Sequence, residues 1–180
     1  MSKKVLILST SLRKNSNSEA LAEAFAKGAK EAGNTVKTIS LRGKSIAFCK
    51  GCLACQKIGK CAISDDANEI AAEMEKSDVI VWATPIYYYE MSGQMKTLID
   101  RTNSLYPSDY AFRDIYLLTA AAEDEEGVDE RTIHGLNGWI ACYEKARLTG
   151  TVFAGGVNEA GEITGHPALK KAYDMATSIR

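Results

Sequence analysis

Residues 5–18, VLILSTSLRKNSNS, carry the pattern that decides the fold class. The first four form a continuous apolar run, which is typical of a parallel strand covered on both faces. A polar loop follows, and beyond it apolar residues recur at helical spacing from Leu21 to Gly28, with a C-cap near Gly33. Strand, polar loop and helix form the opening unit of a doubly wound sheet, so we expect the first strand to be central.

The same alternation continues along the rest of the chain. Apolar runs predict four more strands, at residues 36–41, 79–83, 115–119 and 151–154. Apolar stripes predict the intervening helices, which begin near Asp65, Ser92, Ile133 and Pro167. Strict alternation implies an α/β fold in which a five-stranded parallel sheet has helices on both faces. We expect a single domain over residues 1–180, because no repeat or linker interrupts the pattern.

Composition narrows the classes of partner. The chain has 22 basic and 23 acidic side chains and a net charge of -1. No overall field would hold it on nucleic acid or on an acidic membrane, so small-molecule partners are favoured. The first apolar run is far too short for a membrane span or a signal-peptide core, so we expect a cytoplasmic protein. In that reducing compartment the five cysteines are thiols, metal ligands or redox groups.

The loop after the first strand, residues 9–18, is dense in hydroxyl, amide and cationic groups. It lacks the G-x-G-x-x-G of a dinucleotide fingerprint and the Gly-Lys pair of a nucleoside-triphosphate loop, which excludes both. Its donors and the free N–H groups of a helix start suit a compact phosphomonoester dianion. The alternative is an ordinary polar loop with Asn17 or Ser18 as helix N-cap. The candidate phosphate-binding residues are Ser9, Ser11, Arg13, Ser16, Asn17 and Ser18.

Two further loops follow later strands at the same predicted edge of the sheet. Residues 85–89 contain three consecutive tyrosines, which cannot all face inward, so at least one ring should meet a ligand or a partner chain. The alternatives are an aromatic plug and a dimer contact. Residues 119–122 are small enough to bring backbone donors close to a ligand, or they merely pack. The candidate ligand-binding residues here are Pro85, Ile86, Tyr87, Tyr88, Thr119 and Ala120.

Four cysteines lie within thirteen residues, as C-x2-C-x2-C-x5-C at Cys49, Cys52, Cys55 and Cys61. Such spacing lets sulfurs converge on an iron-sulfur cluster or on zinc, and the alternative is a loop of free or redox-active thiols. Cys142 stands apart within a predicted helix, where a small core residue is expected. His134 and His166 are too scattered for a metal pair and are expected at the surface or as caps.

Residues 10–18 resemble the phosphate loop of the NAD(P)H-dependent FMN reductase family, and residues 84–88 resemble its Ser/Thr-Pro-x-Tyr flavin loop. Thr10 stands where that family usually has glycine, and Leu12 where proline is common. The resemblance implies a flavodoxin-like three-layer sandwich with strand order 2-1-3-4-5. It also implies FMN as cofactor, NAD(P)H as co-substrate, and a homodimer or tetramer with the flavin at subunit contacts.

The cysteine spacing is similar to that of the iron-sulfur flavoproteins, a subgroup of the same family. This second resemblance implies a [4Fe-4S] cluster that passes electrons to FMN, although flavin-only relatives also keep part of the motif. The residues themselves show no readable order of nucleophile, base and orienting group, which argues against a hydrolase. That absence suits a flavoenzyme, because the isoalloxazine carries the chemistry.

Three functions remain open at this point. The leading hypothesis is an oxidoreductase that takes a hydride from NADH or NADPH onto FMN and reduces a small acceptor such as a quinone, a flavin or a metal species. The second is an electron-transfer protein in which the cluster receives electrons from ferredoxin. The third is a binding or redox-sensing protein whose cysteine loop holds zinc or cycles between dithiol and disulfide. The sequence does not identify the electron acceptor, distinguish NADH from NADPH as the donor, or give the number of subunits.

Overall fold

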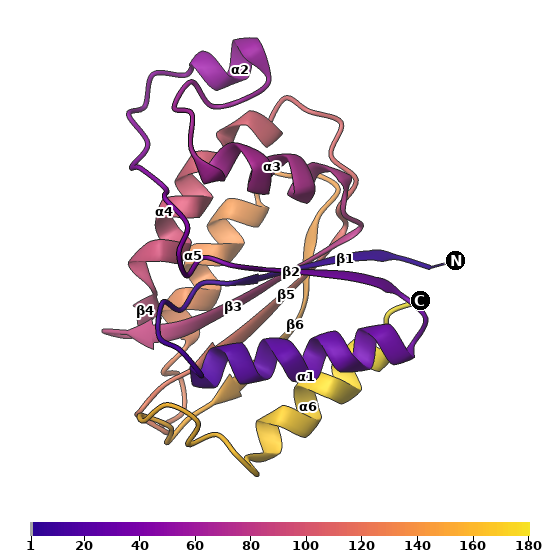
Figure 1. The fold of residues 1–180 in the computed structure, drawn as a ribbon, viewed down its shortest axis with the longest axis vertical. Helices are drawn as coiled ribbons and strands as arrows, with labels where there is room; N and C mark the ends of the chain where they lie inside the picture. The colour runs from indigo at the N-terminus through magenta and orange to yellow at the C-terminus, as the bar shows by residue number, and fades with distance from the viewer. Residues whose placement is uncertain (1) are drawn as a thin grey trace.

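Five parallel strands form the middle layer of the computed structural model, which describes residues 2–180 (Figure 1). They are hydrogen-bonded in the order β2-β1-β3-β5-β6. The elements in chain order are β1 (Lys4–Ser9), α1 (Asn17–Glu31), β2 (Thr35–Ser40), α2 (Ala54–Ile58), α3 (Asp66–Lys76), β3 (Val79–Tyr87), β4 (Glu90–Met91), α4 (Gly93–Arg101), the 3-10 turn η1 (Thr102–Leu105), β5 (Asp114–Ala120), α5 (Glu130–Ile140), β6 (Arg147–Ala154) and α6 (Pro167–Thr177). The predicted order 2-1-3-4-5 is confirmed for the parallel strands.

Successive side chains along each strand point to opposite faces of the sheet and pack into two separate hydrophobic cores, as expected for a sheet covered by helices on both faces. Leu6 and Leu8 pack with residues of α3, α4 and α5 on one face. Val5 and Ile7 pack with residues of α1 and α6 on the other. Figure 1 shows the two helix layers on opposite sides of the sheet.

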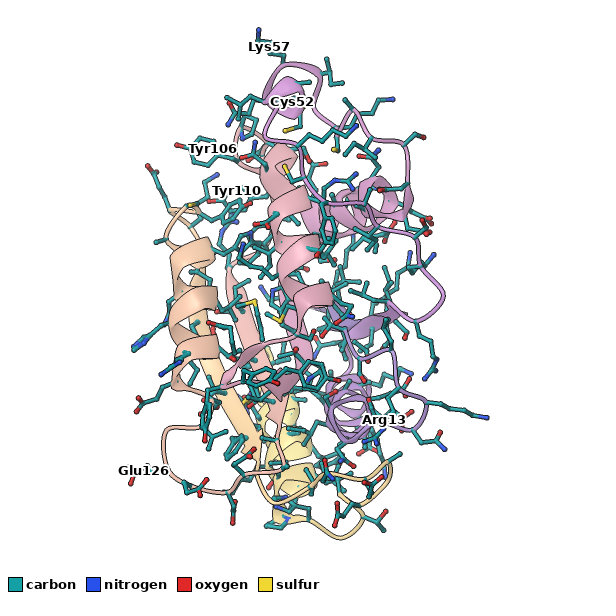
Figure 2. The ribbon with its side chains drawn as sticks, turned by 90° about the vertical axis from the view of Figure 1, so that its left-hand side faces the viewer. Arg13, Cys52, Lys57, Tyr106, Tyr110 and Glu126 are labelled. Carbon is teal, nitrogen blue, oxygen red and sulfur yellow. The ribbon has the colours of Figure 1, made fainter. Side chains whose placement is uncertain are left out.

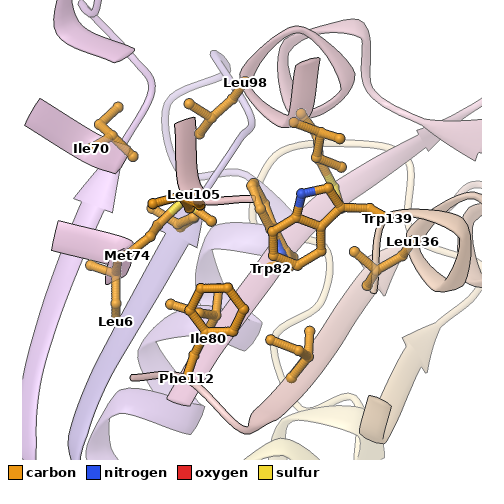
Figure 3. Packing of buried hydrophobic residues seen from close by; sticks show 14 of the residues in the cluster. Leu6, Ile70, Met74, Ile80, Trp82, Leu98, Leu105, Phe112, Leu136 and Trp139 are labelled. Carbon is orange, nitrogen blue, oxygen red and sulfur yellow. The ribbon is translucent and has the colours of Figure 1, made fainter. Parts of the chain in front are cut away.

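Aromatic rings fill the face covered by α3, α4 and α5. Trp82 of β3 meets Trp139 of α5 edge to face, with ring centroids 5.8 Å apart (Figure 3). On the opposite face, α1 and α6 approach so closely that a Cβ at Gly28 would lie 2.3 Å from the carbonyl oxygen of Tyr173. Helices therefore cover both faces of the sheet. The loops that follow the strands lie at its carboxyl edge.

The predicted helix starts are largely confirmed. Asp65, Ser92 and His166 are the N-caps of α3, α4 and α6, and each accepts a hydrogen bond from a backbone N–H of the first turn. The N-cap of α1 is Ser16 rather than Asn17 or Ser18. His134 lies exposed on α5, as expected.

The strand boundaries needed correction. β3 continues through Pro85 to Tyr87 and turns back into the two-residue strand β4, so residues 85–87 are not a loop. The register there pairs Thr84 with Thr119 and Pro85 with Ala120 of β5. β6 begins at Arg147, four residues before the predicted start, and the cysteine segment contains the short helix α2.

The expectation for Cys142 was wrong. The residue follows the last turn of α5 and its side chain is exposed, so it is not a core residue. Among residues 2–180, no helix is both long enough and apolar enough to cross a membrane.

Candidate functional site

A cavity of about 150 Å³ opens at the carboxyl edge of the sheet, between the loops that follow β1, β3 and β5. The strand order reverses between β1 and β3, and open α/β sheets bind ligands at such a switch point. The lining residues are Ser11, Arg13, Ser16, Asn17, Ser18, Pro85, Ile86, Tyr87, Ala120, Ala121, Ala122, Glu123, Val157 and Asn158. The cavity thus brings together predicted residues from all three loops.

Three predicted residues do not line this cavity: Ser9, Thr119 and Tyr88, and Tyr88 lines an adjoining cavity instead. Ser9 is the last residue of β1, and its Oγ is buried without a hydrogen-bond partner. Thr119 is fully buried in β5, where its Oγ1 donates to Asp129 at 3.2 Å. Ser9 and Thr119 both lie within the sheet at the point where side chains still alternate between the two cores, so they support the site only through the backbone.

The start of α1 supplies the polar wall of the cavity. Ser11, Ser16 and Ser18 are all buried, and the Ser16 Oγ accepts the N–H of Glu19 at 3.2 Å. The backbone N–H groups of Asn17 and Ser18 have no acceptor among the described residues. Free N–H groups at a helix start, together with the positive end of the helix dipole, favour an anion. The donor set therefore fits a phosphomonoester.

The segment after β6 closes the cavity from the far side, and the sequence did not point to its lining residues. Asn17 donates its Nδ2–H to the Glu159 carbonyl at 3.0 Å, and its Oδ1 accepts the Ile163 N–H at 3.2 Å. Both ends of its side-chain amide are therefore used in holding the chain, which leaves its backbone N–H for a ligand.

Arg13 also contacts this late segment. Its Nη1 donates to the Asn158 carbonyl at 2.5 Å, and its Nη2 pairs with Glu159 at 3.4 Å. Half of the Arg13 side chain is exposed, so this ion pair is screened and weak. A phosphate in the cavity would compete with Glu159 for the same guanidinium.

Gly155 is the sequence signal that could have located the late segment. A Cβ there would lie 2.2 Å from Oδ1 of Asp124, so only glycine allows the chain after β6 to run against residues 123–124. The two segments are joined by backbone bonds, including Val157 N–H to the Ala121 carbonyl at 2.9 Å. Two segments distant in sequence thus form one wall.

The aromatic hairpin between β3 and β4 forms an adjoining cavity of about 290 Å³, which shares Ile86, Tyr87 and Glu123 with the first. Tyr88 and Tyr89 occupy the two turn positions with φ of 51° and 64°, where glycine or asparagine is normally favoured. The Tyr88 side chain is 97% exposed, whereas the Tyr89 ring lies against Arg131. The strained backbone holds these rings at the mouth of the site.

Three buried hydroxyls connect the hairpin to the loop that follows β1. Thr10 and Thr84 each lie 3.1 Å from Oγ of Ser92, and Thr10 also donates to the Ala83 carbonyl at 3.1 Å. Thr10 stands where the resembling family usually has glycine. Its side chain is fully buried and points into this network, which explains why a larger residue is accommodated.

A larger cavity, of about 620 Å³, lies at the opposite end of the long axis beneath the cysteine loop. All four motif cysteines line it, together with Cys142, Tyr106 and residues of α4 and α5. Figure 2 shows Cys52 and Tyr106 at this end and Arg13 toward the other. The two cavities have no lining residue in common.

One buried ion pair holds the cysteine loop on the domain. Arg101, at the end of α4, has a fully buried side chain and pairs with Asp65 through both carboxylate oxygens, at 2.7 and 2.8 Å. Its remaining donors reach the Ala47 carbonyl at 2.6 Å, the Ile63 carbonyl at 3.2 Å and Sγ of Cys61 at 3.2 Å. Arg101 therefore bonds to the chain on both sides of the cysteine motif.

The electrostatics of this pair follow from its contacts. Burial opposes ionisation of Asp65, but hydrogen bonds from Arg101 and from two backbone N–H groups outweigh it, and the pKa of Asp65 is lowered. The hydrogen bond to Asp65 raises the pKa of Arg101, against the opposing effect of burial. Both groups are charged at neutral pH.

The cysteine sulfurs do not converge on a single ion. Within residues 2–180, no three His, Cys, Asp or Glu side chains come close enough together to hold one metal ion. A tetrahedral zinc with Zn–S bonds of about 2.3 Å would need its sulfurs within about 4 Å of one another. In a four-iron cluster each thiolate binds a different iron, so the sulfurs lie farther apart around a larger body. Four thiols lining one cavity supply the number of ligands that a four-iron cluster needs, whereas their spacing does not suit a single zinc ion.

A parallel sheet in this order, with a helix that starts at the β1/β3 switch point, defines a flavodoxin-like α/β protein. The model of one family, NADPH-dependent FMN reductase, matches residues 3–140. The chain belongs to this family and is an FMN-dependent oxidoreductase.

Curated relatives support the family, and a solved structure supports the fold. The chain is 30% identical to an iron-sulfur flavoprotein of Methanosarcina thermophila over 97% of its own length and 88% of the relative's. It is 31% identical to an iron-sulfur flavoprotein of Methanocaldococcus jannaschii, with 78% and 72% covered. Its fold is similar to that of an NAD(P)H:quinone oxidoreductase from Methanothermobacter marburgensis, with a TM-score of 0.79, 19% identity and 98% and 96% of the two chains covered.

Proposed function

We propose that this protein binds FMN at the carboxyl edge of its sheet, accepts a hydride from NADH or NADPH, and passes electrons to a small acceptor such as a quinone, a flavin or a metal species. The observation that carries the proposal is the cavity at the β1/β3 switch point, which has hydroxyls and free helix N–H groups on one wall and an aromatic hairpin on the other. FMN would supply the hydride and electron chemistry.

The residues of the chain would position the flavin rather than react with it. The start of α1 and Arg13 would hold the terminal phosphate. Pro85, Ile86 and Tyr87 would line one side of the ring system, and the small residues Ala120 to Ala122 would admit backbone groups to the other. The loop lacks the glycine fingerprint of a pyrophosphate site, so FMN is favoured over FAD.

An anaerobic purification tests this proposal. We expect a flavin absorption spectrum, a released cofactor that elutes as FMN, and NADH or NADPH oxidation when a quinone is added. FAD in place of FMN would contradict the phosphate assignment. Bound FMN without any nicotinamide oxidation would contradict the hydride step and leave the cofactor assignment intact.

A second candidate function is electron transfer from a protein donor such as ferredoxin, through a [4Fe-4S] cluster on Cys49, Cys52, Cys55 and Cys61, to FMN. Two observations favour it. The four motif cysteines line one cavity, and residues 42–64 carry five basic and no acidic side chains. Lys50, Lys57 and Lys60 are exposed and make no ion pair among residues 2–180, so they are free to meet an acidic partner.

A cysteine substitution separates the two candidates. Cys52→Ser should abolish iron and sulfide uptake during anaerobic reconstitution and leave FMN bound, because the two cavities share no residue. Cys142→Ser is the matched control, since it lines the same cavity outside the motif and should leave iron content unchanged. If the unaltered protein takes up no iron and sulfide, the cluster is wrong and the NAD(P)H reaction stands alone.

We also propose that the protein works as a homodimer or tetramer. The hairpin at residues 87–89 exposes three aromatic side chains, and the flavin cavity is open on that side. A second subunit would give the flavin another wall. Sedimentation that shows only monomer at micromolar concentration, with FMN fully bound, would contradict this.

A further inference from the structure

We propose that Arg101 and Asn103 are positioning residues for the cysteine ligands, and that their N–H groups raise the reduction potential of a cluster held by Cys55 and Cys61. The inference rests on the proposed cluster. It assigns a role to two side chains outside the motif, on the segment where α4 runs into η1.

The guanidinium of Arg101 is fully used. Each of its five N–H groups has an acceptor, and four of them go to carbonyl or carboxylate oxygens. The fifth, on Nε, is aimed at Sγ of Cys61 over 3.2 Å. A neutral thiol is a weak acceptor, whereas a thiolate is a charged one that a buried cation suits well. The contact would therefore be stronger if the sulfur were a ligand of a metal cluster than if it were a free thiol.

Asn103 makes a second contact of the same kind. Its Nδ2–H donates to Sγ of Cys55 over 3.2 Å, and this is its one side-chain hydrogen bond in the described chain. Cys55 and Cys61 are the half-buried pair of the motif, while Cys49 and Cys52 are exposed. The donors thus act on the two inner sulfurs.

The position of Cys61 is fixed independently of its sulfur. Asn68 of α3 accepts the Cys61 N–H at 2.9 Å and donates to the Cys61 carbonyl at 3.1 Å. Because the backbone is already held, the Arg101 contact is not needed to anchor the residue. Its remaining consequence is electrostatic.

Hydrogen bonds to ligating sulfurs change the electron affinity of a cluster. They withdraw electron density from the thiolates and stabilise the reduced state, which carries one more negative charge. The positive charge of Arg101 acts in the same direction and is weakly screened, since its side chain is fully buried. Removing either donor should therefore make the cluster harder to reduce.

Asn103 gives the cleaner test, because Arg101 also holds the loop and its variants can fail to fold. We would reconstitute the full chain anaerobically as the unaltered protein and as Asn103→Leu, Arg101→Lys and Asn137→Leu. The last makes the same chemical change at an exposed position of α5 that does not line the cavity. Cluster reduction is followed by electron paramagnetic resonance during a redox titration.

At the applied potential that reduces half of the cluster in the unaltered protein, we expect Asn103→Leu to show a ratio of reduced to oxidised cluster about threefold lower. The iron content of the two proteins should be equal. Arg101→Lys, where it folds, should show a larger decrease, and Asn137→Leu none. If the cluster of Asn103→Leu has the same reduction potential as that of the unaltered protein, the inference is wrong, although the proposal that a cluster is bound remains supported. If the unaltered protein takes up no iron and sulfide, both the proposed cluster and the roles of Arg101 and Asn103 are wrong. The proposal that FMN binds in the other cavity is not affected by that result.

Discussion

The proposed flavin cavity and the cysteine cavity are held in place by different means. The first is bounded by strand ends, a helix start and backbone bonds between residues 121 and 157, all continuous with the sheet. The second lies under an excursion that leaves the sheet after Leu41 and returns at α3, and it depends on the Arg101–Asp65 pair. The difference teaches that one cavity is part of the edge of the sheet, whereas the other belongs to an excursion that is attached largely through side chains.

Breaking the ion pair should give the largest effect. Asp65→Ala leaves the Arg101 guanidinium buried without its partner, and we expect the free energy of unfolding to fall by about 3–5 kcal/mol. Urea unfolding measures this loss. Asp66→Ala is the control, because the neighbouring carboxylate accepts the Ser45 N–H and pairs with the partly exposed Lys44, and we expect a clearly smaller loss from it. Equal losses would contradict the special role of the buried pair.

Acid should break the same contact reversibly. The pKa of Asp65 is lowered in the folded protein, so its carboxylate stabilises the fold fully above the ordinary aspartate value of about 3.9. That contribution is lost as the pH falls from there through the folded pKa. We expect the unfolding free energy of the unaltered protein to decline more steeply in this range than that of Asp65→Asn. Parallel pH profiles of stability would show that Asp65 does not titrate as described.

Arg13→Ala tests the flavin cavity alone. If the guanidinium contacts the phosphate, FMN binding should weaken by about 1.5–3 kcal/mol, with no change in the stability of the cysteine loop. Equilibrium dialysis of FMN measures the loss. Lys14→Ala removes the adjacent exposed cation, which does not line the cavity, and should have a much smaller effect. Unchanged flavin retention in Arg13→Ala would rule out its role.

Replacing a hairpin tyrosine should increase the unfolding free energy and weaken FMN binding or subunit association. Tyr89→Gly relieves a left-handed backbone at φ 64°, and we expect a gain in unfolding free energy of about 1 kcal/mol. Tyr106→Gly removes another exposed tyrosine from an ordinary backbone and should give no gain. Weaker FMN binding or dissociation of an oligomer in Tyr89→Gly would indicate what the strain maintains. No gain in thermal or urea stability would mean that the turn is not strained.

The smallest expected effect is an improvement. Glu159→Gln frees Arg13 from its exposed ion pair and removes a negative charge next to the proposed phosphate, so FMN should bind up to about 1 kcal/mol more tightly. Glu126→Gln, on the exposed loop before α5, serves as control. Weaker binding in Glu159→Gln would mean that Glu159 orders the loop rather than competing with the ligand.

Local patterns carried much of the prediction. The run VLIL is apolar on every residue, and a strand with this pattern must be covered on both faces, which made β1 central. Asp65, Ser92 and His166 cap helices through bonds two or three residues away, so short-range chemistry identified them. Residues 9–18 could be named as a candidate phosphate site for the same reason, since their polar donors are consecutive in sequence.

Contacts between distant segments were decided by the tertiary structure. Arg13 meets Asn158 and Glu159, and Arg101 meets Ala47, Cys61 and Asp65, across separations of 36 to 146 residues that no local pattern encodes. β3 runs on through Pro85 because Ala120 of β5 pairs with it there, although proline argues locally for a strand end. Cys142 was predicted to lie in the core as part of a helix, but α5 ends at Ile140 and the residue is exposed in the turn that follows. The sequence by itself determined the layers, the strand order by resemblance, and candidate residues for the two sites, because spacing and side-chain chemistry are local. Folding alone decided that these sites lie at opposite ends of the domain and which buried charge holds the second one.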